Sequence, residues 1–176
     1  MKSIMSLIRL GIVELRSIHF MGGVRIGITG CMNGIPDVSV RNNGKINIAS
    51  HCLIEKCTLA AVNGGTISVK QGTSLGMNDI IISHDRINIG ENCSLAPNIC
   101  IYDHDHCFDV NGKTTGFKTG EVNIGNNVWI GAGVIILRNT TIGDNCIIGA
   151  GTVVKGVIPS NSIVTGDRTM VVKSLK

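Results

Sequence analysis

The stretch "IGNNVWIGAGVIILRNTTIGDNCIIGAGTVV", residues 124–154, repeats one pattern every six residues. An aliphatic residue opens each unit, a Gly often follows it, and a small or β-branched residue comes four positions after the aliphatic one. A helix needs a period of about 3.6 and a strand a period of two, so the observed spacing fits neither. It predicts a solenoid of short strands and tight turns, in which like residues stack from coil to coil.

The repeat covers roughly residues 26–166, with breaks at Gly64-Gly65 and near Asp85-Arg86. Small residues at the fourth position of a unit, such as Cys52, Cys93 and Cys146, are expected to be core fillers rather than reactive thiols. The aliphatic positions expected to fill the interior are Ile48, Ile54, Ala60, Val69, Leu75, Ile81, Ile89, Leu95, Ile101, Ile124, Ile130, Ile136, Ile142, Ile148 and Val154.

Composition places the chain among single-domain globular proteins. Its 176 residues are enough for one domain with a hydrophobic core, and that core must be aliphatic because only 3% of the residues are aromatic. A net charge of +4 is far from the footprint of a nucleic-acid-binding protein. The seven cysteines are odd in number and form no C-x-x-C pair, which favours free thiols in a reducing, cytoplasmic compartment.

The segments that flank the repeat differ from it. Residues 1–22 begin "MKSIMSLIRLGIVELRSIHF", an apolar pattern that Arg9, Glu14 and Arg16 interrupt, so the apolar run is too short for a membrane span or a signal peptide. We expect an amphipathic helix that packs on the body or on a neighbouring subunit, or that contacts the inner face of a membrane peripherally. The solenoid is expected over residues 23–166 and a tail over residues 167–176.

One long interruption separates Ile101 from Ile124 and begins with "YDHDHCFD", residues 102–109. Long insertions in a regular repeat are usually functional, and we expect a loop projecting from one corner at residues 107–120. Two histidines and three carboxylates within eight residues fit a proton-transfer site, a metal site or a solvated acidic loop.

Residues 89–163 resemble the hexapeptide-repeat acyltransferases, and the resemblance implies a left-handed parallel β-helix. It also implies a homotrimer with active sites between neighbouring subunits and acetyl-CoA as acyl donor. The chain looks most like the sugar and polysaccharide O-acetyltransferases, in which the catalytic His precedes an extended loop and a Trp follows it in an "IGxNVWIG" motif; here the motif reads "IGNNVWIGAG". The implied reaction is acetylation of a hydroxyl on a sugar or polysaccharide precursor, in the cytoplasm.

This resemblance assigns roles to particular residues. His104 stands at the position of the general base, with His106 as the alternative. An imidazole suits the task because its pKa lies near the working pH, and a neighbouring carboxylate, Asp103 or Asp105, would fix its tautomer. The acceptor side would include Asp103, Trp129, Asn78 and His84, the last two on weaker grounds.

The same resemblance indicates where coenzyme A would bind. Ala132 and Ala150 match positions at which the backbone meets the pantetheine arm, and small residues there allow close approach. Lys155 and Arg168 are candidate partners of the coenzyme phosphates, or else ordinary solvated charges.

Three alternatives remain open at this point. The first is a sugar N-acetyltransferase of the same fold. The second is a metalloenzyme similar to the γ-class carbonic anhydrases, with His104, His106 and His84 as zinc ligands, although the reading we favour needs no metal. The third is a non-catalytic binding scaffold. The sequence does not identify the acceptor, the acyl chain length, or which of the two histidines is the base.

Overall fold

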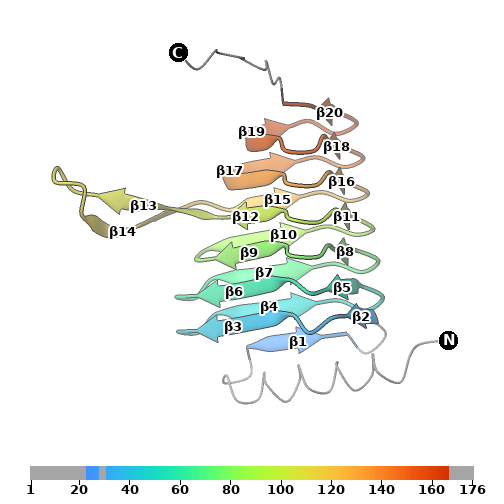
Figure 1. Cartoon of the computed structure of the whole chain (residues 1–176), viewed down its shortest axis with the longest axis horizontal. Coiled ribbons are helices and arrows are strands. Elements are labelled where there is room, and N and C mark those ends of the chain that lie inside the picture. Colours follow the sequence, from blue (N-terminus) through green and yellow to red (C-terminus); the bar gives the residue numbers. More distant parts are fainter. Residues whose placement is uncertain (1–22, 28–30, 167–176) are drawn as a thin grey trace, which may run out of the picture.

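Each turn of the chain contributes strands to three flat faces of a parallel β-helix (Figure 1). The computed structural model describes residues 23–27 and 31–166; the predicted N-terminal helix (1–22), the predicted tail (167–176) and Arg168 lie outside the described residues. Within this part of the chain, all secondary structure is β, as the six-residue period predicts. No helix long and apolar enough to cross a bilayer occurs among the described residues.

The faces are defined by which strands pair in parallel. The first face holds β1 (Val24–Ile26), β4 (Lys45–Ile48), β7 (Thr66–Val69), β10 (Arg86–Ile89), β15 (Val122–Ile124) and the second half of β17 (Ile135–Ile142). The second face holds β2 (Cys31–Asn33), β5 (Leu53–Glu55), β8 (Ser74–Leu75), β11 (Ser94–Leu95), β16 (Trp129–Ile130), β18 (Ile147–Ile148) and β20 (Ile163–Val164). The third face holds β3 (Asp37–Arg41), β6 (Thr58–Val62), β9 (Ile80–Ser83), β12 (Cys100–Tyr102), the first half of β17 and the start of β19 (Val153–Ile158).

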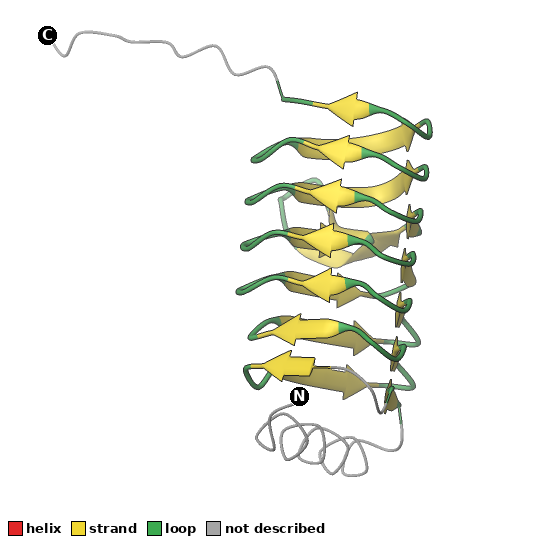
Figure 2. Ribbon diagram, turned by 90° about the vertical axis from the view of Figure 1, so that its right-hand side faces the viewer, coloured by secondary structure: helices red, strands yellow, loops and turns green. Residues whose placement is uncertain are grey.

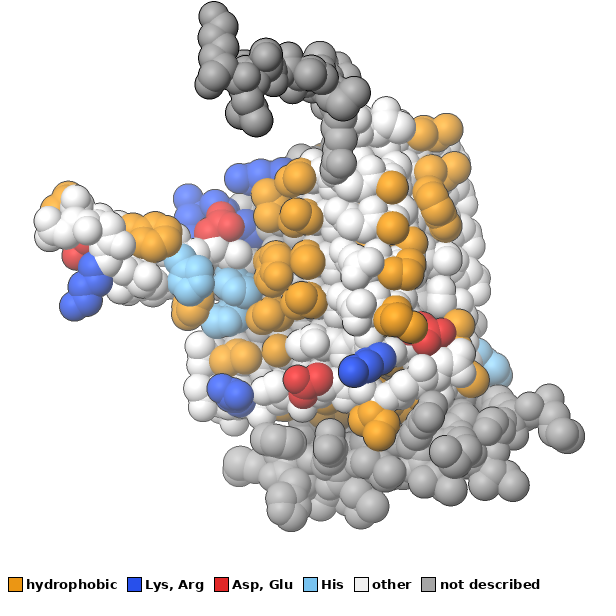
Figure 3. Space-filling view, in the orientation of Figure 1, with side chains coloured by type: hydrophobic (Ala, Val, Ile, Leu, Met, Phe, Trp, Pro, Cys, Tyr) orange, Lys and Arg blue, Asp and Glu red, His pale blue; other side chains and the backbone are white. Residues whose placement is uncertain are grey.

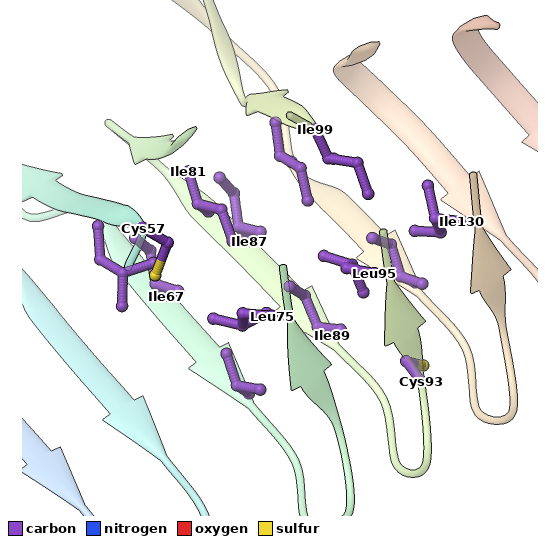
Figure 4. Packing of buried hydrophobic residues seen from close by; sticks show 14 of the residues in the cluster. Cys57, Ile67, Leu75, Ile81, Ile87, Ile89, Cys93, Leu95, Ile99 and Ile130 are labelled. Atoms are coloured by element: carbon purple, nitrogen blue, oxygen red, sulfur yellow. The ribbon is translucent and has the colours of Figure 1, made fainter. Parts of the chain in front are cut away.

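The interior is a set of aliphatic columns that run along the axis of the solenoid (Figure 4). On the first face Ile46, Ile67, Ile87 and Val122 follow one another in register, and all four are fully buried. Successive side chains of a strand point alternately into the solenoid and out of it. Because neighbouring strands pair in register, inward side chains stack on inward side chains from coil to coil. The predicted core positions are therefore buried, with one exception.

Ala60 is that exception: it is half-buried and lies on the outer side of β6. The strand buries Leu59 and Ala61 instead, because it pairs with β9 so that Leu59 lies opposite Ile81. The six-residue frame thus shifts by one position in this strand. The three predicted core fillers are confirmed, since Cys52, Cys93 and Cys146 are free thiols with at most 2% of their surface exposed.

Turns join the faces at the corners (Figure 2), and several of these turns contain residues with positive φ angles. At one corner Asn127, Asn145 and Asn161 have φ angles of 54°, 57° and 61°, and their side-chain amides form a ladder with N···O distances of 3.2 and 3.1 Å. Asn tolerates this conformation better than other residues with a Cβ. At the same corner a Cβ on Gly90 would lie 2.2 Å from the carbonyl oxygen of Gly125, so the coils stack too closely for any larger residue.

Candidate active site

The interruption of the repeat is a β-hairpin that projects from the corner between the third and first faces (Figure 1). Its strands are β13 (His104–Phe108) and β14 (Thr114–Thr119), and they pair antiparallel. The Asp109 carboxylate accepts hydrogen bonds from the N–H groups of Asn111 and Lys113, both at 2.9 Å, and so closes the turn. The loop expected at 107–120 is therefore an ordered hairpin, and it starts three residues earlier, at His104.

Asp103, the last residue before the hairpin, is fully buried and anchors it to the preceding coil. Its Oδ2 accepts hydrogen bonds from the Ser83 hydroxyl at 2.6 Å and from the Asp85 N–H at 2.8 Å. Its Oδ1 accepts from the His84 N–H at 2.8 Å and lies 3.2 Å from Nδ1 of His104. Because a carboxylate only accepts, we assign to His104 the tautomer with the proton on Nδ1, in which Nε2 is the basic nitrogen.

The imidazoles at the root of the hairpin form an aromatic cluster (Figure 3). The ring centroid of His84 lies 4.1 Å from that of His104 and 4.2 Å from that of Phe117. Phe117 is also 4.8 Å from His106, its cross-strand partner. The His104 side chain is 11% exposed, whereas His106 is an exposed residue. His104 is thus held on two sides, and His106 contacts the cluster through Phe117.

Burial and the neighbouring His104 lower the pKa of His84, and the charge of Asp103 opposes that shift only in part. A lowered pKa means that His84 is neutral at neutral pH and gains a proton only in more acidic solution. Two imidazoles in contact disfavour being charged together. At neutral pH the root of the hairpin therefore holds the Asp103 carboxylate beside the neutral imidazole of His84.

Two ion pairs join the hairpin stems to the neighbouring coils. Asp105 on the outgoing strand pairs with Arg138 of the next coil, with 2.5 Å between Oδ2 and Nε. Glu121, which follows the returning strand, pairs with Arg86 of the preceding coil at 2.9 Å. The second pair is exposed on both sides and contributes little stability, whereas the Arg138 side chain is only 11% exposed.

Two residues predicted for the acceptor side lie away from this cluster within one chain. Asn78 is exposed at the corner between the second and third faces, where its Nδ2 donates to Oδ1 of Asn98 at 3.4 Å. Trp129 lies on β16 of the second face with 47% of its surface exposed, in register with Ser94 and Ile147. His84, Asp103 and His104 are brought together, and the roles of Asn78 and Trp129 stay predictions.

The residues predicted to meet coenzyme A fall at two corners. Ala132 and Ala150 are both exposed and lie on successive coils, where the Gly151 N–H donates to the carbonyl of Ala132 at 2.8 Å. Lys155 is exposed on β19, at the corner from which the hairpin projects and one coil beyond Arg138. Arg168 cannot be placed, because it lies outside the described residues.

Sequence reasoning missed three residues of this site: Ser83, Phe117 and Arg138. Of the three, only Arg138 stands out in the sequence, because it is a basic residue that directly follows the apolar run "VIIL". Ser83 and Phe117 carry no comparable signal, since each becomes relevant only through a contact with a residue distant in sequence. In residues 23–27 and 31–166 no group of three or more His, Cys, Asp and Glu side chains is arranged to hold a metal ion.

Comparison with known proteins shows that the chain is similar to transferases. Residues 121–156 match the family model described as "Bacterial transferase hexapeptide (six repeats)". The galactoside O-acetyltransferase of Escherichia coli is 34% identical over 116 residues, which cover 64% of this chain and 56% of that protein. The chain spans about half the length of the curated relatives it matches.

Solved structures share the fold over most of the chain. The polysialic acid O-acetyltransferase OatWY superposes with a TM-score of 0.67 at 25% identity, covering 86% of this chain and 80% of that one. AntD, an N-acyltransferase from Bacillus cereus solved with dTDP and coenzyme A, superposes with a TM-score of 0.64 at 23% identity, covering 93% of this chain and 88% of that one. The AntD likeness concerns the fold alone.

Proposed function

We propose that the chain is a hexapeptide-repeat acyltransferase and that it transfers an acetyl group from acetyl-CoA to a hydroxyl of a sugar or polysaccharide precursor. Its similarity to members of that family supports the proposal. The observation that carries the proposal is the hydrogen-bond relation between a fully buried carboxylate, Asp103, and the imidazole of His104 at the root of the hairpin. A galactoside and polysialic acid are the acceptors that two of the similar proteins are named for, which supports a carbohydrate hydroxyl.

The proposed chemistry uses His104 as the general base. Nδ1–H donates to Asp103, so the lone pair of Nε2 takes the proton of the acceptor hydroxyl as its oxygen attacks the thioester carbonyl carbon. The tetrahedral intermediate then expels the coenzyme A thiolate, which receives the proton from the imidazolium. The acceptor gains an acetyl ester and the coenzyme leaves as the free thiol. Asp103 stabilises the imidazolium while it exists.

The complete site would lie between two subunits of a homotrimer. Trp129 is on a different face from His104 within one chain, so it would reach an acceptor bound at His104 only from a neighbouring subunit. The exposed apolar column of Trp129, Ile147 and Ile163 on the second face supports a protein contact there. Ala132, Ala150 and Lys155 would line the acetyl-CoA side, in a cytoplasmic protein.

The test is a thiol-release assay with acetyl-CoA across a panel of sugars, amino sugars and serine. We expect acetyl ester formation on a sugar hydroxyl, and we expect His104→Ala to lower kcat by about 100- to 10,000-fold with the oligomer intact. Wild-type turnover in His104→Ala would show that His104 is not the general base, and that the base is His106 or that the reaction needs no such base. Acetylation of amines alone would mean an N-acetyltransferase, and stoichiometric zinc in the purified protein would favour the metalloenzyme.

A further inference from the structure

Arg138 lies at the corner of β17, directly after the coil that bears the hairpin, and it is largely withdrawn from solvent. Its Nε donates to Oδ2 of Asp105, which is the only acidic partner that its guanidinium has among the described residues. A cation this buried needs a partner, so removing Asp105, whose side chain is 47% exposed, leaves the guanidinium of Arg138 without compensation. The ion pair therefore ties β13 firmly to the next coil.

Asp105 lies between His104 and His106 on β13, so its ion pair with Arg138 affects the direction in which both imidazoles point. Successive side chains of a strand point to opposite sides, so Asp105 faces away from His104 and His106. With Asp105 held toward Arg138, both imidazoles must face the side of Phe117 and His84. A rotation or slip of β13 by one residue would exchange the two sides and withdraw both imidazoles from the cluster.

Other anchors lie at the root of the hairpin. The contact of His104 Nδ1 with Oδ1 of Asp103 holds the imidazole ring, and the pair of Asp105 with Arg138 adds a constraint at the next residue of β13. The hydrogen bonds to the Asp103 carboxylate fix residue 103 itself, which precedes the strand. On the returning side, the Gly120 N–H donates to the Asp103 carbonyl and the Asn139 N–H donates to the Gly120 carbonyl. These bonds hold the stems together, whereas the contact of Asp105 with Arg138 selects which side of β13 faces the cluster.

We propose that Arg138 is a positioning residue: through Asp105 it fixes the rotation of β13 and thereby holds the imidazole of His104 in its working orientation. The proposal rests on the proposed function, because it assumes that His104 is the base. Arg138 does not touch the reacting atoms. It acts from the next coil, so that the base is held by the preceding coil through Asp103 and by the following coil through Asp105.

The experiment compares Arg138→Met, Asp105→Asn and the double variant. Met retains much of the apolar stem of the arginine and removes its charge, so packing is largely preserved. We expect each single variant to lower kcat by about 10- to 100-fold, with the KM for acetyl-CoA changed by less than about twofold. The double variant should be no worse than the poorer single variant, because both changes break one interaction. Arg138→Lys, which keeps the charge, should recover part of the lost kcat.

Trypsin cleavage at Lys113 and Lys118 provides a readout that is independent of activity. We expect Arg138→Met to accelerate cleavage, and Arg86→Met, which breaks the exposed pair with Glu121 on the returning stem, to leave both kcat and cleavage near wild type. Wild-type kcat in Arg138→Met, or a fall in kcat with additive losses in the double variant, would overturn the proposal. If the wild-type protein acetylates no acceptor, the proposed function fails. Independently of that result, an unchanged cleavage rate in Arg138→Met would show that the ion pair of Arg138 with Asp105 does not hold the hairpin.

Discussion

At the scale of single residues, a buried carboxylate organises the candidate site. Asp103 receives three hydrogen bonds from the corner Ser83–Asp85 and contacts the ring of His104. The sequence predicted that Asp103 or Asp105 would orient an imidazole, and the structure gives the two residues different partners. Asp103 contacts His104, while Asp105 pairs with Arg138. Sequence spacing could not separate them, because the distinction depends on which coil each side chain reaches.

A second buried carboxylate makes a prediction about stability and pH. Asp79 is fully buried, and burial raises its pKa from 3.8 to about 6, although N–H groups of Ile99 and Gly76 donate to it. The folded state thus keeps a proton that the unfolded chain releases. The contribution of this group to stability is present below pH 4 and is lost as the pH rises to about 6, by an amount on the order of 3 kcal/mol.

The measurement is urea unfolding between pH 4 and pH 7 for the wild type and for Asp79→Asn. The Asn side chain does not titrate, so the difference in unfolding free energy between the two proteins should change across this interval and be constant above it. The baseline of the variant should be lower, because one of the two backbone donors loses its acceptor. A difference that stays constant from pH 4 to pH 7 would show that Asp79 does not titrate there.

At the scale of elements, the hairpin is attached to the coil stack without taking part in it. Its β13 and β14 pair only with each other, while β15 pairs with β10 on one side and β17 on the other. The sequence predicted where the repeat stops and resumes. It did not predict the hairpin, because pairing of "HDHCF" with "TTGFKT" depends on cross-strand contacts such as His106 with Phe117, and neither segment has the apolar alternation of a strand against a core.

Excision of the hairpin tests this independence. The Gly120 N–H donates to the Asp103 carbonyl at 2.8 Å, so the two stems are already adjacent and a Gly-Gly link can replace residues 104–119. The deletion also carries Arg138→Met, so that no buried cation is left without Asp105. We expect thermal unfolding within a few degrees of wild type, since only nearest-neighbour coils contribute to the core. Acetyl transfer should be absent, because both candidate bases are removed. A fall in Tm of more than about 10 °C would show that the hairpin supports the core.

At the scale of the whole molecule, the separation of His104 and Trp129 on different faces makes the proposed trimer testable. If each site takes His104 from one subunit and Trp129 from its neighbour, mixed trimers of His104→Ala and Trp129→Ala subunits contain some sites with both native residues. Each mixed trimer has one such site in three, so the purified mixed trimers should restore about a third of the wild-type sites. Coexpression with two affinity tags, tandem purification and the acetyl-CoA assay provide the measurement.

The control for this experiment is a mixture of the two purified variants without subunit exchange, which should remain as inactive as each variant alone. Recovery of no activity in mixed trimers of normal size would mean that Trp129 and His104 do not share a site between subunits. High activity of Trp129→Ala by itself would remove Trp129 from the proposed site.

Features of the fold that depend on the local repeat could be predicted from the sequence, whereas features that depend on contacts between distant residues could not. The period of six residues predicted the solenoid and the buried positions from Ile89 to Val154, because each coil repeats the same packing. It failed at Ala60, where pairing of β6 with β9 sets which residues point inward. The role of Arg138 was also missed, since it depends on a contact between residues 33 positions apart.

The position of the hairpin at a corner also bears on how this protein can change over generations. Ile87 and Val122 are neighbours in the sheet although the hairpin separates them in sequence, so the coil stack is continuous across the insertion. Lengthening, shortening or replacing the tip leaves every coil-to-coil contact in place. Natural selection can therefore alter the segment nearest the candidate base while the hydrophobic interior is inherited unchanged, and new acceptor preferences can arise without loss of the scaffold.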